Sequence, residues 1–283
     1  MGREEMSSKI DITNAAIIIK GAGEMASGIA HRLYRAGMTH ILMLEAASPL
    51  CVRRFVSFCE AVHDGSAEVE KIKARLALRL PEVASIWQAG EIAVIVDPQW
   101  KSIAGLKPDI VIDAILAKRN LGTRKDEAAL VVGVGPGFTA PVDAHAVIES
   151  NRGHNLGRVI YDGSAEPYTG MPGEIKGIAK ERVLRAPVDG VVKHVHHLGD
   201  DVKDGDLVLY VDDAPVYAPF DGILRGLIRE MAVDKGEKVG DVDPRAKRDY
   251  CFTISEKARG IAGGVLEAVL HYYFGKNERE RCL

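Results

Sequence analysis

The predicted fold is decided by the stretch Ala15-Ala16-Ile17-Ile18-Ile19-Lys20-Gly21-Ala22-Gly23-Glu24-Met25-Ala26-Ser27-Gly28. A short apolar run of β-branched residues breaks into the pattern G-x-G-x-x-A, and a helical pattern follows at once. In a dinucleotide-binding βαβ unit, Gly21 makes the tight turn, Gly23 lets the backbone approach a pyrophosphate, and Ala26 lets the helix pack on the strand. The helix start also offers free N–H groups to an anion.

A second apolar run, Ile41–Leu44, predicts the next buried strand, and Glu45 stands at its end. An acidic residue at about this distance meets a ribose 2′-OH in dinucleotide-binding folds. A glutamate there disfavours a 2′-phosphate, so any dinucleotide is expected to be NAD rather than NADP. The alternative is a strand–turn–helix that simply opens an α/β domain.

Composition places the chain among ordinary globular proteins. It has 283 residues, a formal net charge of -3 and 47% hydrophobic residues, which allows one large domain or two smaller ones. These values argue against a basic nucleic-acid surface and an acidic disordered tail. The first residues carry acids without an apolar core, no run approaches the ~20 apolar residues of a membrane span, and the four cysteines form no C-x-x-C pair. We therefore expect a cytoplasmic protein that contacts neither nucleic acid nor membrane.

Further apolar runs extend the predicted sheet. Residues 92–98, 108–115 and 129–134 are each predicted to form a buried strand, and largely apolar strands of this kind are typical of a parallel sheet covered on both faces. Residues 72–78 alternate apolar and basic or small side chains, which favours a half-exposed strand, although a helical spacing also fits. The prediction for residues 1–180 is a Rossmann-like domain with a parallel sheet.

Loops after these strands are rich in groups that bind anions. In a parallel sheet such loops gather at the carboxyl edge, where open α/β folds bind their ligands. Taken with the opening turn, they complete a set of predicted binding residues: Gly21, Gly23, Ala26, Glu45, Arg53, Arg54, Lys118, Arg119, Asn120, Gly135, Gly137, Thr139, Arg152, His154 and Arg158. Each loop alone could be a solvated connection. Together they predict a pocket for a phosphate-bearing or nucleotide-like ligand.

The final third of the chain contains an internal repeat. Residues 185–192 are echoed by 217–224, and residues 199–203 by 236–240. Short strands with A-P-x-D-G turns resemble the biotinyl/lipoyl-like barrel-sandwich hybrid, so we expect such a module at residues 181–245. Carrier domains of that kind bear a modified lysine between the two halves. The linking segment Val208–Val216 contains no lysine, and neither biotin nor lipoate is expected.

Two further features complete the picture of this region. His194, His196 and His197 have no nearby Cys or carboxylate at zinc-like spacing, so no metal site is predicted. Residues 251–270 read as a helix with Ser255 as its N-cap. Three glycines inside that helix cost about 1 kcal/mol each relative to alanine, which predicts close backbone packing. We expect residues 246–283 to form a helical segment that docks back on the first domain.

Several motifs together resemble one family. The match spans nearly the whole chain and rests on residues 19–23, 28–33, 52–54, 60–62, 117–123, 135–140, 145–149, 151–154, 240–245 and 262–267. The set resembles the YqeB-type accessory proteins of the selenium-dependent molybdenum hydroxylase system. Their Rossmann-like part is related to the XdhC family, which resembles a chaperone that loads molybdenum cofactor into its client.

The resemblance implies a maturation protein whose partner is a molybdenum hydroxylase or its maturation machinery. It implies as ligand NAD or another nucleotide, or a molybdopterin-type cofactor. The alternative is an NAD-dependent oxidoreductase, for which His145, His154 and Tyr161 are candidate proton donors. A pure interaction module is a third option, and a homo-oligomer stays open. Cys51 and Cys59 flank the arginine pair, and we expect buried structural thiols, with a sulfur-handling role for either as the alternative.

Overall fold

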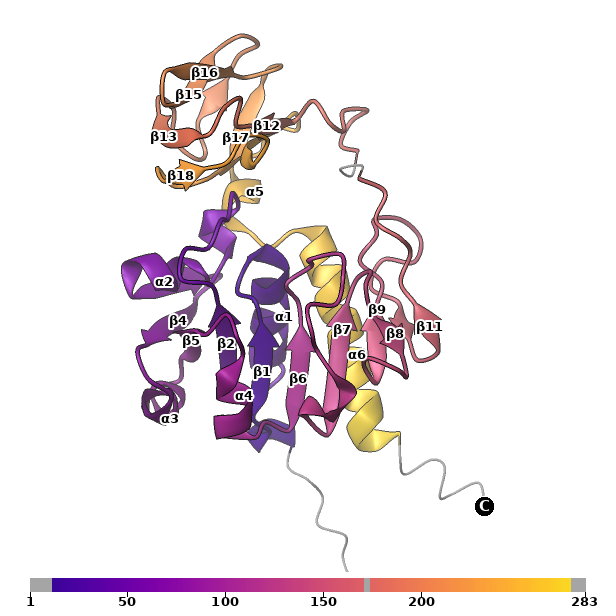
Figure 1. Ribbon diagram of the computed structural model, residues 1–283. Coiled ribbons are helices and arrows are strands. Elements are labelled where there is room, and N and C mark those ends of the chain that lie inside the picture. The colour runs from indigo at the N-terminus through magenta and orange to yellow at the C-terminus, as the bar shows by residue number, and fades with distance from the viewer. Residues whose placement is uncertain (1–11, 171–173, 276–283) are drawn as a thin grey trace, which may run out of the picture.

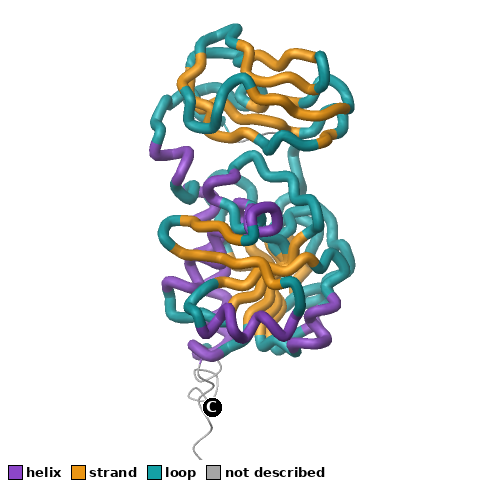
Figure 2. The backbone as a smooth tube through the Cα atoms, turned by 90° about the vertical axis from the view of Figure 1, so that its left-hand side faces the viewer, coloured by secondary structure: helices purple, strands orange, loops and turns teal. Residues whose placement is uncertain are grey.

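The computed structural model describes residues 12–170 and 174–275. In this part of the chain a larger α/β unit lies below a smaller all-β unit (Figure 1), and the last long helix returns to the larger unit. Figure 2 shows the same two layers from the side, with the strands of the smaller unit stacked above the twisted large sheet.

Within the described residues, the larger unit is built on a nine-stranded sheet. Its strands are, in spatial order, β10 (Val159–Ile160), β9 (Ala146–Ile148), β7 (Leu130–Val134), β6 (Ile110–Asp113), β1 (Ile17–Lys20), β2 (Ile41–Glu45), β5 (Ile92–Val96), β4 (Ile72–Ala77) and β3 (Ser66–Val69). The strands from β9 to β4 run parallel, whereas β10 and β3 are antiparallel to their neighbours.

Apolar side chains on both faces explain why the central strands are continuous apolar runs. Along β1, Ile17 and Ile19 point into one core and Ile18 into the core on the opposite face. All three are fully buried. A strand covered on both faces cannot show the alternation of a half-exposed strand, because neither face meets water.

Helices cover both faces of this sheet. Helices α1 (Glu24–Arg35) and α6 (Glu256–Phe274) pack on one face, and α3 (Val83–Gln88) and α4 (Lys101–Leu106) pack on the other. No helix in the described residues has the length and apolarity needed to cross a bilayer.

The remaining short elements connect these parts. They are the helices α2 (Glu60–Asp64) and α5 (Asp249–Phe252), the 3₁₀ turns η1 (Ile12–Asn14), η2 (Arg54–Val56), η3 (Leu80–Glu82) and η4 (Lys125–Glu127), and the paired strands β8 (Thr139–Ala140) and β11 (Gly163–Ser164).

The smaller unit consists of two four-stranded antiparallel sheets. One contains β12 (Val183–Arg185), β19 (Lys238–Asp243), β17 (Gly222–Leu227) and β14 (Asp201–Val202); the other contains β16 (Ala214–Tyr217), β15 (Leu207–Val211), β13 (Gly190–His194) and β18 (Ala232–Val233). Both enclose a core of their own that includes Val192, Val208, Leu224 and Val239. The β15–β16 turn contains Asp212 and Asp213 and no lysine, and the expectation that no biotin or lipoate is attached stays a prediction.

Polar contacts join the two units. The backbone N–H of Leu227 donates to the carbonyl of Val52 at 2.8 Å, and Arg54 Nε donates to the carbonyl of Leu227 at 2.8 Å. Arg229 Nε donates to Glu60 Oε2 at 2.7 Å. The segment that follows β2 is therefore hydrogen-bonded to the last residue of β17 and to Arg229, which lies two residues beyond that strand.

The predicted fold class, a Rossmann-like parallel sheet followed by a barrel-sandwich hybrid, is wrong. The large sheet is mixed, because β3 turns back on β4 through Glu70 and Lys71, which both have positive φ, and because β10 turns back on β9. The smaller unit pairs its strands in two separate antiparallel sheets. The apolar runs predicted the strands themselves, but they carry no information on which way the edge strands run.

Small residues let α6 approach α1 and the loop after β9. A Cβ added at Gly28 of α1 would lie 2.9 Å from the Cβ of Ala258 in α6. A Cβ added at Gly264 would overlap the carbonyl oxygen of Gly157, whereas one at the neighbouring Gly263 would meet nothing within 4 Å. Two adjacent glycines of one helix thus have different roles.

Gly264→Ala is expected to lower the free energy of unfolding by roughly 1–3 kcal/mol, because the methyl group would force the helix away from backbone that cannot move aside. Gly263→Ala is expected to raise it by up to about 1 kcal/mol, since alanine has the higher helix propensity and the site has room. Urea denaturation followed by circular dichroism measures both. Equal effects in the two variants would contradict this account of α6.

Candidate functional site

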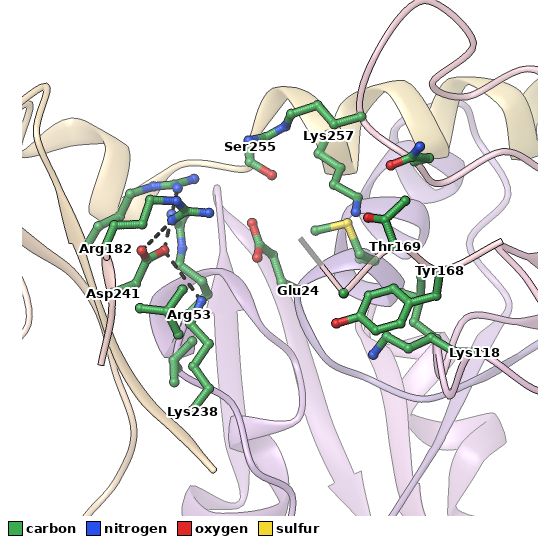
Figure 3. A pocket seen from close by; sticks show the side chains of 18 of the residues that line it. Glu24, Arg53, Lys118, Tyr168, Thr169, Arg182, Lys238, Asp241, Ser255 and Lys257 are labelled. Carbon is green, nitrogen blue, oxygen red and sulfur yellow. Dashed lines mark hydrogen bonds and ion pairs between the residues drawn. The ribbon is translucent and has the colours of Figure 1, made fainter. Parts of the chain in front are cut away.

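A cleft of about 560 Å³ lies between the two units, at the carboxyl edge of the large sheet (Figure 3). The starts of α1 and α6 form part of its wall, and β12, β17 and β19 of the smaller unit form another part. Its lining residues are Glu24, Met25, Val52, Arg53, Leu116, Lys118, Asn151, Arg152, Tyr168, Thr169, Gly170, Arg182, Val183, Arg185, Arg225, Lys238, Asp241, Ser255 and Lys257.

Positive charge dominates this lining. Eight of the side chains are lysine or arginine, and two, Glu24 and Asp241, are carboxylates. The N-termini of α1 and α6 add the positive ends of two helix dipoles. The electrostatic character of the cleft is therefore that of a binding site for an anion.

Arg53 is the most deeply buried of these cations without a full set of partners. Its residue is 3% exposed, and its Nη2 donates to the carbonyl of Thr253 at 3.0 Å. Its Nε and Nη1 are buried and have no hydrogen-bond partner among the described residues. Burial lowers the pKa of Arg53, and the negative charge of Glu24 opposes that shift. A guanidinium group in this state lacks the acceptors that normally accompany a buried charge.

Asp241 collects the cations of the smaller unit. Arg182 Nη1 donates to its Oδ1, Lys238 Nζ lies 3.6 Å from its Oδ2, and Arg225 Nη1 lies 4.0 Å from the same oxygen. One carboxylate thus interacts with three cations. Figure 3 shows Asp241 together with two of them, Arg182 and Lys238, and with the neighbouring side chain of Arg53. Burial lowers the pKa of Lys238, and Asp241 opposes the shift.

Cations from the larger unit line the other side of the cleft. Lys118 Nζ lies 4.6 Å from the ring centroid of Tyr168, and Arg152 Nη2 lies 2.6 Å from Glu256 Oε1. Burial lowers the pKa of Lys257, and the charge of Arg152 lowers it further. Ser255 Oγ accepts from the N–H of Ala258 at 3.3 Å and so caps the start of α6.

Three residues of the predicted set line this cleft directly, namely Arg53, Lys118 and Arg152. Gly23 is the N-cap of α1 and immediately precedes the lining residue Glu24. Gly21 forms the turn after β1 with φ +90, and Ala26 is 1% exposed in the core. The last two shape the opening turn without facing the cleft.

The carboxylate of Glu45, which was predicted to bind a ribose, accepts hydrogen bonds from the backbone instead. Its Oε2 accepts from the N–H of Ala22 at 2.7 Å, and its Oε1 accepts from the N–H of Ala46 at 2.7 Å. The N–H of Cys59 also donates to the carbonyl of Ala22 at 2.8 Å, so the segment after β2 lies against the glycine turn. These contacts hold the turn together and favour a structural role for Glu45.

The other predicted residues build loops rather than the cleft lining. Arg54 joins the two units through its hydrogen bond to the carbonyl of Leu227. Asn120 Oδ1 accepts from the N–H groups of Gly122 and Thr123 at 2.8 Å each, within its own loop. A Cβ on Gly137 would lie 2.5 Å from the Cα of Arg119, so these two loops touch through backbone.

The last members of the predicted set also lie outside the cleft. A Cβ on Gly135 would lie 2.5 Å from Ser150 Oγ, and Thr139 Oγ1 lies 2.9 Å from Ser164 Oγ. His154 is exposed, and Arg158 lines a separate pocket of about 480 Å³.

The predicted set did not include Glu24 at the start of α1, nor the part of the site that comes from the smaller unit and from α6. The residues of that part are Arg182, Arg185, Arg225, Lys238, Asp241, Ser255 and Lys257. A usable signal was present: Arg225 and Asp241 are charged residues inside apolar strand patterns, and both are buried. Buried charges in strands are rare enough to mark a paired network or a ligand site.

Cys51 immediately precedes Val52 of the cleft lining, and no cysteine of the described residues belongs to that lining. Cys59 is 1% exposed, and Cys51 is half-buried with its Sγ 3.0 Å from Ser57 Oγ. A hydrogen bond with Cys59 lowers the pKa of the Cys51 thiol. Cys282 lies outside the described residues. Within those residues, no three His, Cys, Asp or Glu side chains are grouped so as to hold a metal ion.

No family model matches the chain. Among solved structures, it is similar to the product-bound ectoine utilization protein EutE (DoeB) from Ruegeria pomeroyi, with 11% identity, 81% of this chain and 85% of that chain covered, and a TM-score of 0.26. It is also similar to a succinylglutamate desuccinylase/aspartoacylase from Rhodobacter sphaeroides, with 15% identity, the same coverage and a TM-score of 0.25.

The predicted functions, a maturation protein for a molybdenum hydroxylase and an NAD-dependent oxidoreductase, are wrong by these comparisons. One of these structures is an ectoine utilization protein and the other a succinylglutamate desuccinylase/aspartoacylase, and neither name refers to cofactor insertion or to a dehydrogenase. Their identities and TM-scores are too low to assign an activity to this chain. The prediction of a molybdenum cofactor role likewise finds no support in them.

A curated relative is far more similar in sequence. The chain is 48% identical over 255 residues to "Uncharacterized protein YqeB" of Escherichia coli (strain K12), a match that covers 90% of this chain and 47% of the relative. The chain therefore spans about half the length of that relative. The resemblance to YqeB-type proteins inferred from the motifs is supported at this level, and the relative's printed name assigns no activity.

Proposed function

We propose that this chain binds a small organic anion with more than one negative group in the cleft between its two units. The observation that carries the proposal is the guanidinium of Arg53, which is 3% exposed and has two buried nitrogens without a partner. Charged groups in protein interiors are normally paired, because removing an ion from water costs several kcal/mol. An anionic ligand would supply the missing partner.

The surroundings of Arg53 support the same ligand class. A guanidinium group presents a planar fork of donors that matches carboxylate and phosphate oxygens. The first backbone N–H groups of an α-helix have no hydrogen-bond partner within the helix. The starts of α1 and α6 therefore offer such donors to an anion. The cleft volume of about 560 Å³ lies within the range of small-molecule sites.

Arg53→Met is expected to weaken the binding of citrate or pyrophosphate, used as probes, by roughly 10- to 100-fold. The net loss expected is that of one charge-assisted hydrogen bond, worth ~1.5–3 kcal/mol. Without a ligand, the free energy of unfolding is expected to stay unchanged or to rise, since a buried charge is removed. Titration calorimetry measures the first effect, and urea denaturation measures the second.

Arg54→Met is the matched control, because Arg54 carries the same charge one residue away but bonds to the carbonyl of Leu227. Its removal should leave probe affinity within about threefold and lower stability by ~1 kcal/mol through the lost hydrogen bond. Equal loss of binding in both variants would point to a general charge effect and against a site at Arg53.

The lysines make anion binding depend on pH. Burial lowers the pKa of Lys238 and Lys257, so each loses its proton at a lower pH than an ordinary lysine. A protonated lysine attracts the anion and a neutral one does not. Affinity for citrate, whose own charge is constant above neutral pH, is therefore expected to fall as pH rises toward the ordinary lysine range.

The double variant Lys238→Arg/Lys257→Arg keeps both charges but replaces groups that titrate in this range with groups that do not. Its affinity for citrate should stay flat with rising pH where that of the original protein falls. Calorimetric titrations across the alkaline range compare the two. A flat profile for the original protein would contradict a contribution from these lysines.

A further inference from the structure

Seven of the eight cations of the cleft fall into two groups, and the eighth, Arg185, donates to the carbonyl of Gly236 at 2.7 Å. The inner cluster consists of Arg53, Arg182, Arg225 and Lys238, gathered around Asp241. The outer cluster consists of Lys118, Arg152 and Lys257. Figure 3 shows the labelled members on opposite sides of the cleft, with Arg53, Arg182 and Lys238 on one side and Lys118 and Lys257 on the other. A ligand that contacts both clusters needs an anionic group at each end.

Glu24 lies between the two clusters, and its carboxylate points into the cleft (Figure 3). It is the first residue of α1. Among the described residues its carboxylate has no ion pair within 4.0 Å and no hydrogen bond. Burial lowers the pKa of Arg53 and Lys238 on one side and of Lys257 on the other, and the negative charge of Glu24 opposes that shift in all three. It therefore acts on both clusters without being bound by either.

An acidic residue at a helix start has an ordinary role, because it interacts favourably with the helix dipole. That role does not require the carboxylate to face a cleft between two sets of cations. In this place its charge repels the middle of any uniformly negative ligand, such as an inorganic polyphosphate. It favours a ligand whose middle donates a hydrogen bond or carries positive charge.

We propose that the ligand is an anion with a carboxylate or phosphate at each end and an N–H donor, such as a protonated amine, between them, and that Glu24 reads this donor. This inference rests on the proposed function and adds the chemical class of the ligand. Glu24 acts in it as a specificity-determining residue. The two clusters bind the ends, and the carboxylate selects the middle.

Two small probes test the inference, because they match in length and differ at one atom. Glutarate has a central methylene between its two carboxylate arms, and iminodiacetate has a protonated secondary amine there. Iminodiacetate also chelates divalent cations, so both probes are titrated in metal-free buffer. The original protein is expected to bind iminodiacetate roughly tenfold more tightly than glutarate, as one charge-assisted hydrogen bond predicts.

Glu24→Gln is expected to abolish this preference and to tighten the binding of glutarate, since the repulsive charge is gone. Glu256→Gln serves as the control, because it removes a carboxylate at the start of α6 that pairs with Arg152. It should change both affinities alike and leave their ratio near that of the original protein.

The outcomes separate the two proposals. If glutarate binds the original protein as tightly as iminodiacetate, or if Glu24→Gln keeps the tenfold ratio, the assignment of Glu24 is overturned while the anion site stands. If neither probe binds, and citrate and pyrophosphate also fail to bind, the proposed function itself fails. A ratio that collapses in Glu24→Gln and persists in Glu256→Gln supports both.

Discussion

The close packing of α6 on α1 is the constraint on which the rest of the structure depends. Gly28 and Ala258 meet without room for a larger side chain, and Gly264 lies against the backbone of Gly157. Because α6 follows the all-β unit in the chain, this contact returns the C-terminal part to the large sheet. It also brings the starts of two helices to the same end, where the cleft opens between the units.

Two buried cations show how this protein treats charge. Lys20 is fully buried, and its Nζ donates to Thr123 at 2.6 Å and to Glu127 at 2.7 Å while lying 3.7 Å from the ring centroid of Trp100. Arg53 is nearly as buried but keeps two unpartnered nitrogens. The first is a satisfied structural charge that anchors the loop after β6. The second is a buried charge for which the described residues do not supply all the hydrogen-bond acceptors. For this reason we interpret the cleft as a ligand site.

Local features were predictable from the sequence because they depend on neighbouring residues. Apolar runs marked β2, β5, β6 and β7, and Ser255 caps α6 as its position suggested. The site was only partly predictable. Arg53 and Lys118 follow strands of the large sheet, and the sequence therefore places them at its carboxyl edge. Arg225 and Lys238 come from the smaller unit, and a hydrophobic pattern does not show where that unit packs on the first. The direction of the edge strands β3 and β10 was also not predicted, because the turns that precede or follow them decide it and the apolar pattern does not.

Stability and binding are coupled through the same residues. The cleft gathers more positive charge than Asp241 and Glu24 neutralise, and that excess works against the folded state when no anion is bound. Contacts elsewhere offset it, among them the bonds that join Val52 and Arg54 to Leu227. An anion that spans both sides of the cleft would also connect the two units. Ligand binding should therefore stabilise their docking as well as the fold, because a ligand that binds only the assembled cleft adds its binding free energy to both.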